Sequence, residues 1–508
     1  MRKLLTGAAV ALPAAFLPAA FLPSVLPAAG AAPARPDLAK LVTSKDVEAH
    51  LKAFQEIADF NGGDRAAGSP GYGVSVKYVA GRLKKAGFSP KIQKFSYPYW
   101  REKSGAVLAR TAPSKKSYKR GEDFVTLAYS GSGDVTAPVV AVDIPAKGKE
   151  GTSGCGKKDF KGFEKGSIAL VQRGACTFET KAARARSAGA AAVVIYNKPG
   201  AKGPVNGTVT KPSKIPVVGP THAMGAALAK EAKKGKLKLH VKTDTVHGKR
   251  SSSNVIAETD RGRDDNVVLL GAHLDSVPEG PGINDNGTGA AALLAIAAKI
   301  GELGKDGLRN RVRFAWWGAE EEGLRGSTHY VEELSRRDRD AIALNLNFDM
   351  LGSRNGTRGV YDGDHSTGAG IRAPAGSGAI EKMFRDYFKG RKLPTTQSEF
   401  NGRSDYGPFV EHGIAAGGMD TGADGVKTAA EAKTFGGKAG KVYDPCYHAK
   451  CDGLKNVHLK LLDTNVDGIA HVTQHLARTT VAVNGGARMT LDREPSYRPV
   501  WRGPYQLR

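Results

Sequence analysis

Short apolar segments alternate with helical stretches between residues 252 and 480, and this alternation most restricts what the chain can fold into. The stretch 288–300 is apolar throughout and is expected to form a buried helix. The apolar segments expected to form strands are 267–270, 312–317, 343–350 and 414–419. Such alternation builds a mixed, mostly parallel sheet with helices on both faces. We therefore expect an α/β fold.

A different texture appears between residues 128 and 247, where Gly- and Lys-rich loops separate short Val/Ala/Ile segments. Strands are expected at 138–142, 167–171 and 191–196, with a helix at 179–188. This predicts a separate β-rich domain over 128–247. It interrupts an α/β domain formed by 35–127 and 248–482. The Arg- and Pro-containing tail 483–508 is expected to be a peripheral packing arm.

Residues 1–34 have the pattern of a secretory signal: a basic start, an apolar middle and a run of small residues. A membrane anchor is the alternative, but Pro13, Pro18, Pro23 and Pro27 interrupt the apolar part of the segment. No later run of about 18 apolar residues follows. We expect a secreted protein without a membrane span.

The chain contains four cysteines, which suits an oxidising compartment. Proximity in the sequence favours the pairs Cys155–Cys176 and Cys446–Cys451. Four cysteines allow three connectivities, and free buried thiols are the further alternative.

The formal net charge is +25, large enough to attract an anionic partner. However, the Lys and Arg residues are scattered, and no aromatic residues interleave with them as in a nucleic-acid binder. We interpret the charge as a solvated surface and expect no nucleic-acid partner.

Potential metal ligands follow the predicted strands. They are His273, Asp285, the run Glu320–Glu322, Asp349 and, in a Cys-flanked loop, His448. Alone, each is more typical of a structural residue, and three adjacent glutamates are more typical of a solvated loop. Sites in open α/β sheets form outside the carboxyl ends of the strands, so these residues are expected to meet.

Two histidines and three carboxylates suit zinc. One carboxylate can bridge two metal ions, and a pair of ions polarises a carbonyl while activating a water. A neighbouring carboxylate that binds no metal can take the proton of that water. Cobalt or manganese would use the same ligands.

Five motifs carry a family resemblance: GAHLDS, NDNGTGAAALL, FAWWGAEEEGLRGS, NFDMLGS and YDPCYHAKCD. They resemble those of the secreted dinuclear zinc aminopeptidases of the streptomycete and aminopeptidase Y type, which have the Zn-exopeptidase fold. The early segment NGGDRAAGSPGY at 61–72 belongs to the same match, which runs from about 37 to 482. Segments between 162 and 197 resemble a protease-associated (PA) domain, which several relatives carry as an insertion.

The resemblance implies two Zn²⁺ ions per chain. His273 and Asp349 are similar to the ligands of one ion, and Glu321 and His448 to those of the other. Asp285 is similar to the ligand that bridges them.

The resemblance also implies the catalytic roles. Glu320 is similar to the general base, and Tyr447 to the tyrosine that donates a hydrogen bond to the oxyanion. A merely packed tyrosine is the alternative. Asp275 fits a carboxylate that orients the imidazole of His273.

Three residues are expected to contact substrate. Met350 adjoins a ligand, and Arg403 is similar to an arginine that shapes the binding site, with a role in loop structure as the alternative. Asp420 stands where relatives often have an aromatic residue. We expect it to favour a basic first residue through a charge-assisted contact.

A calcium site is a further expectation, because in streptomycete relatives an N-terminal dipeptide and a helical acidic pair bind Ca²⁺. The matching residues are Asp37, Leu38, Asp463 and Asp467. Oxygen ligands suit calcium, and a solvated acidic face is the alternative.

The resemblance implies a hydrolase that releases the N-terminal residue from peptides with a free N-terminus, and we expect the protein to be a monomer. A zinc-bound water would be the nucleophile. A carboxypeptidase or aminoacylase with the same fold is the second reading. A metal-free binding protein is the third, although such relatives lose ligands and this chain retains all five.

Overall fold

The computed structural model describes residues 36–485 except 206 and 210, and the side chains of 305 and 306 are left out as well. The expected signal segment 1–34 and the tail beyond 485 lie outside the described residues. The strands are β1 (Lys91–Ala112), β2 (Lys116–Ser117), β3 (Phe124–Thr126), β4 (Gly133–Ala141), β5 (Ile168–Gln172), β6 (Ala192–Tyr196), β7 (Val217–Pro220), β8 (Lys238–Glu258), β9 (Arg263–His273), β10 (Asn310–Trp317), β11 (Ile342–Phe348), β12 (Gly359–Tyr361), β13 (Thr396–Ser398) and β14 (Ala416–Asp420).

The helices frequently begin at a side-chain cap, as at Thr43, Ser69 and Thr177, whose hydroxyls accept backbone N–H groups of the first turn. The helices are α1 (Leu38–Leu41), α2 (Ser44–Phe60), α3 (Pro70–Lys85), α4 (Phe178–Ser187), α5 (His222–Ala232), α6 (Thr288–Ile300), α7 (Gly304–Gly307), α8 (Arg325–Glu333), α9 (Arg336–Asp340), α10 (Ser377–Gly390), α11 (Gly407–Glu411), α12 (Ala429–Phe435), α13 (Leu459–Arg478) and α14 (Val481–Asn484).

The sheet that carries the predicted ligands has the strand order β13-β12-β14-β11-β9-β10-β8. Its central pairs β10–β9, β9–β11 and β11–β14 are parallel, whereas β8 and β12 pair antiparallel with β10 and β14. The expected mixed, mostly parallel sheet is confirmed.

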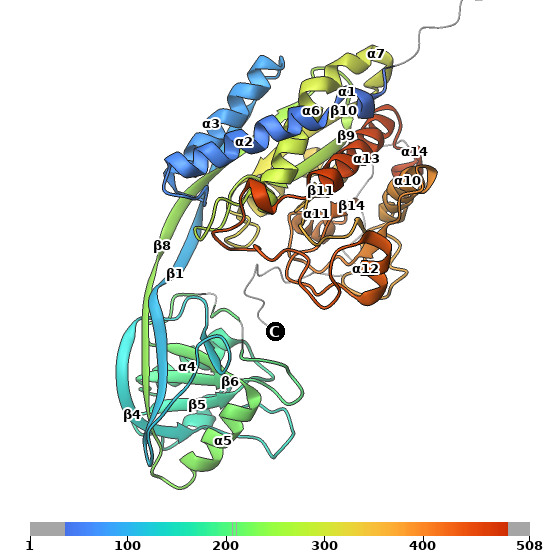
Figure 1. Cartoon of the computed structure of the whole chain (residues 1–508). Coiled ribbons are helices and arrows are strands. Elements are labelled where there is room, and N and C mark those ends of the chain that lie inside the picture. Colours follow the sequence, from blue (N-terminus) through green and yellow to red (C-terminus); the bar gives the residue numbers. More distant parts are fainter. Residues whose placement is uncertain (1–35, 206, 210, 486–508) are drawn as a thin grey trace, which may run out of the picture. The chain divides into compact units, whose positions relative to one another are not determined.

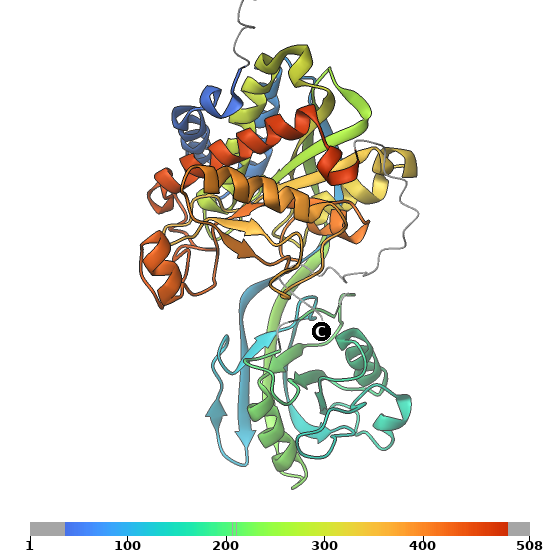
Figure 2. The same ribbon diagram turned by 90° about the vertical axis from the view of Figure 1, so that its right-hand side faces the viewer.

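Helices cover both faces of this sheet because its central strands are apolar on both sides. In β9, Val268 and Leu270 pack into the core formed with helices α1, α2, α3, α6, α10 and α13. Leu269, which points the other way, packs with Trp317 and Phe409 against α8 and α11. Figures 1 and 2 show these helices around the sheet.

Strands β1 and β8 form a long antiparallel ribbon that is shared by two sheets. Lys91 pairs with Ile256 at one end, and Ala112 pairs with Lys238 at the other. β8 pairs with β10 near its carboxyl end and with β4 near its amino end. The ribbon therefore runs from the ligand-bearing sheet into the inserted unit, and β8 passes through residue 247 without a break (Figure 1).

The inserted unit is itself a layered structure. Strands β4, β5, β6 and β7 pair in parallel, and β3 joins β7 antiparallel. Alternate residues of β5 face different cores: Val171 packs with Phe178 of α4, and Leu170 packs with Leu228 of α5.

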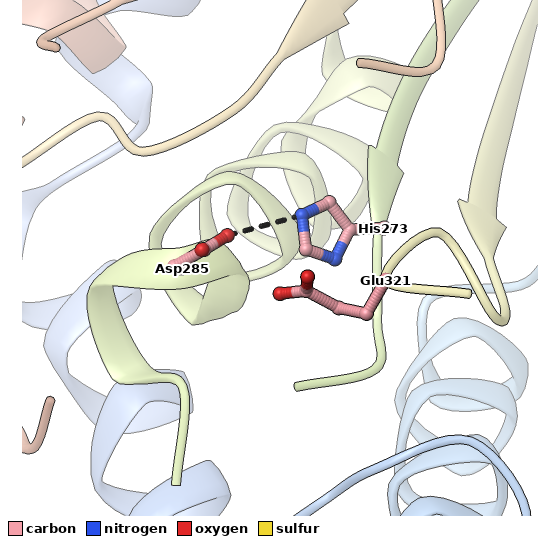
Figure 3. A group of neighbouring side chains, drawn as sticks. All are labelled: His273, Asp285 and Glu321. Atoms are coloured by element: carbon pink, nitrogen blue, oxygen red, sulfur yellow. Dashed lines mark ion pairs between the residues drawn. The ribbon is translucent and has the colours of Figure 1, made fainter. Parts of the chain in front are cut away.

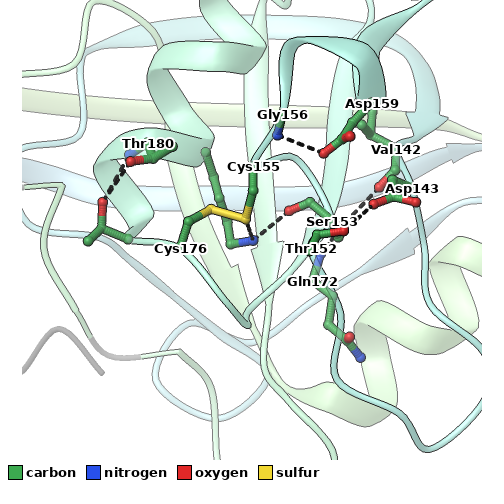
Figure 4. The surroundings of a disulfide bond; sticks show 12 residues. Val142, Asp143, Thr152, Ser153, Cys155, Gly156, Asp159, Gln172, Cys176 and Thr180 are labelled. Atoms are coloured by element: carbon green, nitrogen blue, oxygen red, sulfur yellow. Dashed lines mark hydrogen bonds between the residues drawn. A yellow bond between two sulfur atoms is a disulfide. The ribbon is translucent and has the colours of Figure 1, made fainter.

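Both expected disulfides are present in the structure, Cys155–Cys176 and Cys446–Cys451, and no described cysteine is free. Around the first, Ser153 donates to the carbonyl of Val142 and accepts from the N–H of Gln172 (Figure 4). The bridge joins the loop between β4 and β5 to the loop before α4, while Ser153 binds the first loop to β5.

Within the described part of the chain, none of the helices is long and apolar enough to cross a membrane.

Candidate metal centre

The predicted ligands meet at the carboxyl edge of the central sheet. β9 ends at His273, and Asp349 directly follows β11. Glu320 and Glu321 follow β10, the strand parallel to β9. Parallel strands end at the same edge of the sheet, so the side chains that follow them lie close together although they are far apart in the sequence.

Asp285 lies at the centre of the cluster, in a one-turn segment (Ile283–Gly287) directly before α6. Its Oδ1 is 3.2 Å from His273 Nε2, and its Oδ2 is 3.2 Å from His448 Nε2. Asp349 Oδ1 is 3.3 Å from His273 Nε2, and Glu321 Oε2 is 3.0 Å from His448 Nε2. Two His–carboxylate pairs therefore share one aspartate.

Figure 3 shows His273, Asp285 and Glu321 converging on one point. Ligand atoms of these three lie within 4.8 Å of one another, as do those of His273, Glu320 and Asp349. The two groups overlap at His273, which places Glu320 beside the cluster.

The residues fit a divalent cation. Glu321 Oε1 is buried and has no hydrogen-bond donor among the described residues, and Asp349 Oδ1 makes no hydrogen bond there beyond its ion-pair contact with His273. Buried carboxylate oxygens without a partner are costly unless a cation neutralises them. The donor set of imidazole nitrogens and carboxylate oxygens is the one that zinc accepts.

The electrostatics of the protein groups agree with this fit. Burial raises the pKa of Glu320 well above its ordinary value and that of Glu321 to about 7. Burial opposes the charge of His448, but Glu321 and Asp285 outweigh it and raise the pKa of the imidazole to about 11. Such carboxylate crowding is what positive charge at the site would relieve.

Comparison with known proteins identifies the families that this chain resembles. Residues 254–473 match the model of peptidase family M28, and residues 135–228 match the PA domain. An aminopeptidase of Pseudomonas aeruginosa is 45% identical over 453 residues, covering 88% of this chain and 83% of that protein. The chain belongs to peptidase family M28.

Solved structures agree with the family. An aminopeptidase from Aneurinibacillus sp. strain AM-1 matches with a TM-score of 0.65 and 26% identity, covering 89% of this chain and 96% of the other. BSAP, a zinc aminopeptidase from Bacillus subtilis, matches with a TM-score of 0.54 and 25% identity, covering 87% and 96%. The predicted resemblance to zinc aminopeptidases with an inserted PA domain is confirmed.

The predicted metal ligands line one side of a pocket of about 430 Å³. The three expected substrate contacts, Met350, Arg403 and Asp420, line it, and so does Tyr447. Arg403 donates to both carboxylate oxygens of Asp424, at 2.9 and 3.4 Å, and to the hydroxyl of Tyr447 at 3.0 Å. The guanidinium thus faces the pocket and also fixes its wall.

Arg403 and His448 hold Tyr447 in place. Its ring stacks on that of His448 with centroids 3.8 Å apart. Its hydroxyl oxygen accepts from Arg403, so the phenolic proton remains available for another acceptor.

Asp275 lies next to His273, as expected, and contacts it mainly through its main chain. The backbone carbonyl of Asp275, not its carboxylate, lies 3.0 Å from His273 Nδ1, whereas the nearest carboxylate oxygen is 3.8 Å away. The carboxylate instead accepts the N–H groups of Glu320 at 3.1 Å and Glu321 at 3.3 Å. Asp275 therefore orients the imidazole through its main chain and the two glutamates through its side chain.

Other supporting residues were not singled out from the sequence. Ser404 donates to Asp349 Oδ2 at 2.5 Å and accepts from Asn347 Nδ2 at 2.8 Å. Asp452 accepts the N–H groups of Asn284 and Asp285, each at 3.0 Å. Ser404 lies in the NGRSD segment and Asp452 in the last quoted motif, but spacing does not reveal these contacts.

Arg65 ties down the segment between two ligands. The side chain is fully buried and donates to the carbonyls of Leu274, Pro281 and Gly282. These carbonyls lie between His273 and Asp285 in sequence, so one buried guanidinium closes that loop.

The expected calcium ligands form a separate group. Burial, with Asp463 and Asp37 nearby, raises the pKa of Asp467 to about 6. Among the described residues, these three carboxylates are not one of the clusters with ligand atoms within 4.8 Å. The backbone N–H of Leu38 donates to Gln474 Oε1. The calcium site remains a prediction.

Proposed function

We propose that this M28 chain is an aminopeptidase with a dinuclear zinc centre that hydrolyses the N-terminal residue from peptides. The placement of Asp285 carries the proposal, because its two oxygens face two separate His–carboxylate pairs. His273 and Asp349 would hold one ion, Glu321 and His448 the other, and Asp285 would bridge them. Bound zinc supplies carbonyl polarisation and a lowered pKa for an attacking water.

The protein groups around the cluster supply the remaining chemistry. Glu320 is buried beside His273 and Asp349, outside the two His–carboxylate pairs, and acts as general base. It takes the proton of the attacking water and passes it to the leaving amine. Tyr447 donates a hydrogen bond to the carbonyl oxygen as that oxygen gains negative charge.

The pocket is suited to the amino end of a peptide. Besides the cluster, the carboxylates of Glu399, Asp420 and Asp424 line it. Arg403 is the cation in this part of the wall, and Asp424 engages it with both oxygens. This charge balance favours a substrate ammonium group over a free carboxylate, and so favours an aminopeptidase over a carboxypeptidase.

Asp420 is proposed to select a basic N-terminal residue. Its Oδ1 accepts from Ser398 Oγ and from the N–H of Gly422, both at 3.1 Å. Burial raises the pKa of Asp420 to about 6, so the carboxylate is charged at neutral pH. An N-terminal Lys or Arg side chain would pair with it.

Hydrolysis of matched aminoacyl anilides tests the activity. Leu, Phe, Lys and Arg p-nitroanilides would be compared with their N-acetylated forms, with a chelator present and after zinc is restored. The proposal expects release only from free-amine substrates, lost on chelation and regained with two zinc ions per chain. Cleavage of dipeptides or N-acyl amino acids, with no anilide released, would contradict it and favour a carboxypeptidase or aminoacylase.

Secretion, oligomeric state and calcium binding complete the proposal. We propose that the protein is secreted and monomeric, that its substrates carry a free N-terminus, and that residues near Asp37, Asp463 and Asp467 bind Ca²⁺ as a structural ion. The disulfides support secretion. Calorimetric titration of chelator-treated protein with Ca²⁺, compared between wild type and Asp467→Asn, tests the calcium site.

A further inference from the structure

A second groove adjoins the cluster of predicted metal ligands on the side of the β1–β8 ribbon. It has a volume of about 320 Å³ and shares Glu321 and His448 with the substrate pocket, so the two depressions meet at the cluster. Its walls come from Tyr99, Trp100 and Arg101 of β1, Arg250 of β8, and the segment 276–279. Half of the residues that line the groove lie outside the matched M28 segment 254–473.

Arg250 lines this groove and lies over the ring of Tyr99. Its guanidinium carbon lies 3.4 Å from the centroid of the Tyr99 ring, a stacked arrangement that orients the planar group. Arg250 is exposed and makes no ion pair with any described residue. Its donors therefore remain available to a ligand.

The two other arginines of the groove have carboxylate partners, whereas Asp275, Glu321 and Glu322 add negative charge to its lining. Arg101 pairs with Glu279 at 3.1 Å, and Arg120 pairs with Glu102. Glu322 is half-buried and also lines the groove. Burial raises the pKa of Glu322 to about 7, and the nearby charge of Arg250 opposes this rise, although the two side chains form no ion pair. A planar cation held on an aromatic ring suits a carboxylate, which guanidinium groups bind in a fork.

The position of the groove indicates which part of a substrate reaches it. A peptide whose first residue occupies the acidic pocket has its scissile carbonyl at the cluster. The chain after that bond must leave on another side, and the groove begins at Glu321 and His448. Carboxylates line both depressions, but the groove also presents Arg250, a guanidinium without an ion-pair partner among the described residues. A carboxylate located after the scissile bond would therefore meet a cation in the groove.

We propose that this groove binds the residue after the scissile bond and that Arg250 there recognises a carboxylate. The carboxylate is either the C-terminus of a dipeptide or the side chain of an acidic second residue. The inference rests on the proposed aminopeptidase activity and extends it to a preference for short or acidic peptides.

The test compares substrates that differ only after the scissile bond. They are Leu-p-nitroanilide and Leu-Ala-NH₂, which lack a carboxylate, and Leu-Ala and Leu-Glu-NH₂, which carry one at either location. Zinc-loaded wild type would be compared with Arg250→Ala and Arg250→Lys. Lys249→Ala is the matched control, because it removes one charge from the neighbouring position of β8, and Lys249 does not line the groove.

We expect Arg250→Ala to lower kcat/KM about tenfold for the carboxylate-bearing substrates, mainly through KM, as befits one charged hydrogen-bonding group. Hydrolysis of Leu-p-nitroanilide and Leu-Ala-NH₂ should stay at the wild-type rate. Arg250→Lys should fall between the two, and high salt should shrink the difference. The affected substrate, Leu-Ala or Leu-Glu-NH₂, identifies the source of the carboxylate.

Equal losses on all four substrates would overturn the proposal, as would no loss on any of them. Calorimetric binding of Leu-Glu to zinc-loaded Glu320→Gln protein, with and without Arg250→Ala, gives a readout that needs no turnover. If wild type cleaved none of the substrates, the proposed function would fail. This binding comparison would still decide whether Arg250 recognises a carboxylate.

Discussion

Asp285 presents one carboxylate oxygen to His273 and the other to His448, each at 3.2 Å. The carboxylate of Asp452 accepts a hydrogen bond from the backbone N–H of Asp285 at 3.0 Å. The bridging geometry therefore depends on both the side chain and the main chain of one residue.

Replacing this bridge should remove the metal pair. Asp285→Asn keeps the shape but loses one anionic oxygen, so we expect less than one zinc per chain and at least about a thousandfold loss of kcat/KM. Elemental analysis and Leu-p-nitroanilide hydrolysis measure the two effects. The exposed Asp260→Asn is the control and should retain both. Full zinc content in Asp285→Asn would refute the bridging assignment.

Glu320 and Glu321 are adjacent but should behave differently. Glu320→Gln removes a general base, so we expect kcat to fall by about a hundred- to ten-thousandfold while zinc content stays normal. Glu321→Gln removes a ligand and should lower zinc content. The two variants would be compared by metal analysis and steady-state kinetics. The reverse pattern would exchange the two roles.

Ser404 should tune the metal site without touching substrate. Ser404→Ala removes the hydrogen bond to Asp349 and leaves Asn347 Nδ2 without this acceptor. Loss of such a supporting contact costs about ten- to a hundredfold in metal affinity. Competition with a zinc chelator measures this change. Ser404→Thr keeps the hydroxyl and should retain more of the affinity. Unchanged affinity in Ser404→Ala would count against a positioning role.

Asp420 should govern the choice of first residue. Asp420→Asn preserves the size of the side chain but removes its charge. We expect the kcat/KM ratio of Lys- to Leu-p-nitroanilide to fall about tenfold, with little change for the Leu substrate alone. An unchanged ratio would show that the pocket does not read charge at this position.

Acid sensitivity should depend in part on His50, a buried residue of α2 whose Nδ1 lies 2.7 Å from the hydroxyl of Tyr78. Burial, aided by Arg82, lowers its pKa from 6.5 to about 4. The folded protein thus binds this proton less readily than the unfolded chain, so stability is lost as pH falls from 6.5 towards 4. The loss is at most about 3 kcal/mol.

Thermal unfolding at pH 7 and pH 5 checks this expectation. His50→Phe should show a smaller fall in Tm between the two pH values than wild type. His247→Gln, at an exposed position of β8, should keep the wild-type difference. Identical differences in all three proteins would contradict the assignment.

The ligand set could be predicted because each residue directly follows a strand or lies in a distinctive motif, and parallel strands bring such positions together. Helix α6 has the bounds expected from its apolar run. The short strands β12 and β13 have three residues each, too few for a recognisable pattern.

Contacts between distant loops could not be predicted. Ser404 reaches Asp349 across 55 positions, and Arg250 reaches Tyr99 across an antiparallel ribbon. The spacing of His273 and Asp275 indicated a supporting contact but did not reveal which oxygen makes it. Such details depend on backbone direction at a turn, which residue types do not specify.

The ribbon of β1 and β8 means that the PA domain is not attached through a flexible tether. The chain enters the PA domain through β1 and leaves it through β8, and these two strands are hydrogen-bonded to each other. Removing residues 128–247 as a block would cut β8 within its length and strip partners from β1. A shortened enzyme would need a new tight turn that joins the two strands, for example at the Glu102–Thr245 pair. Such a turn would keep the remaining parts of β1 and β8 paired.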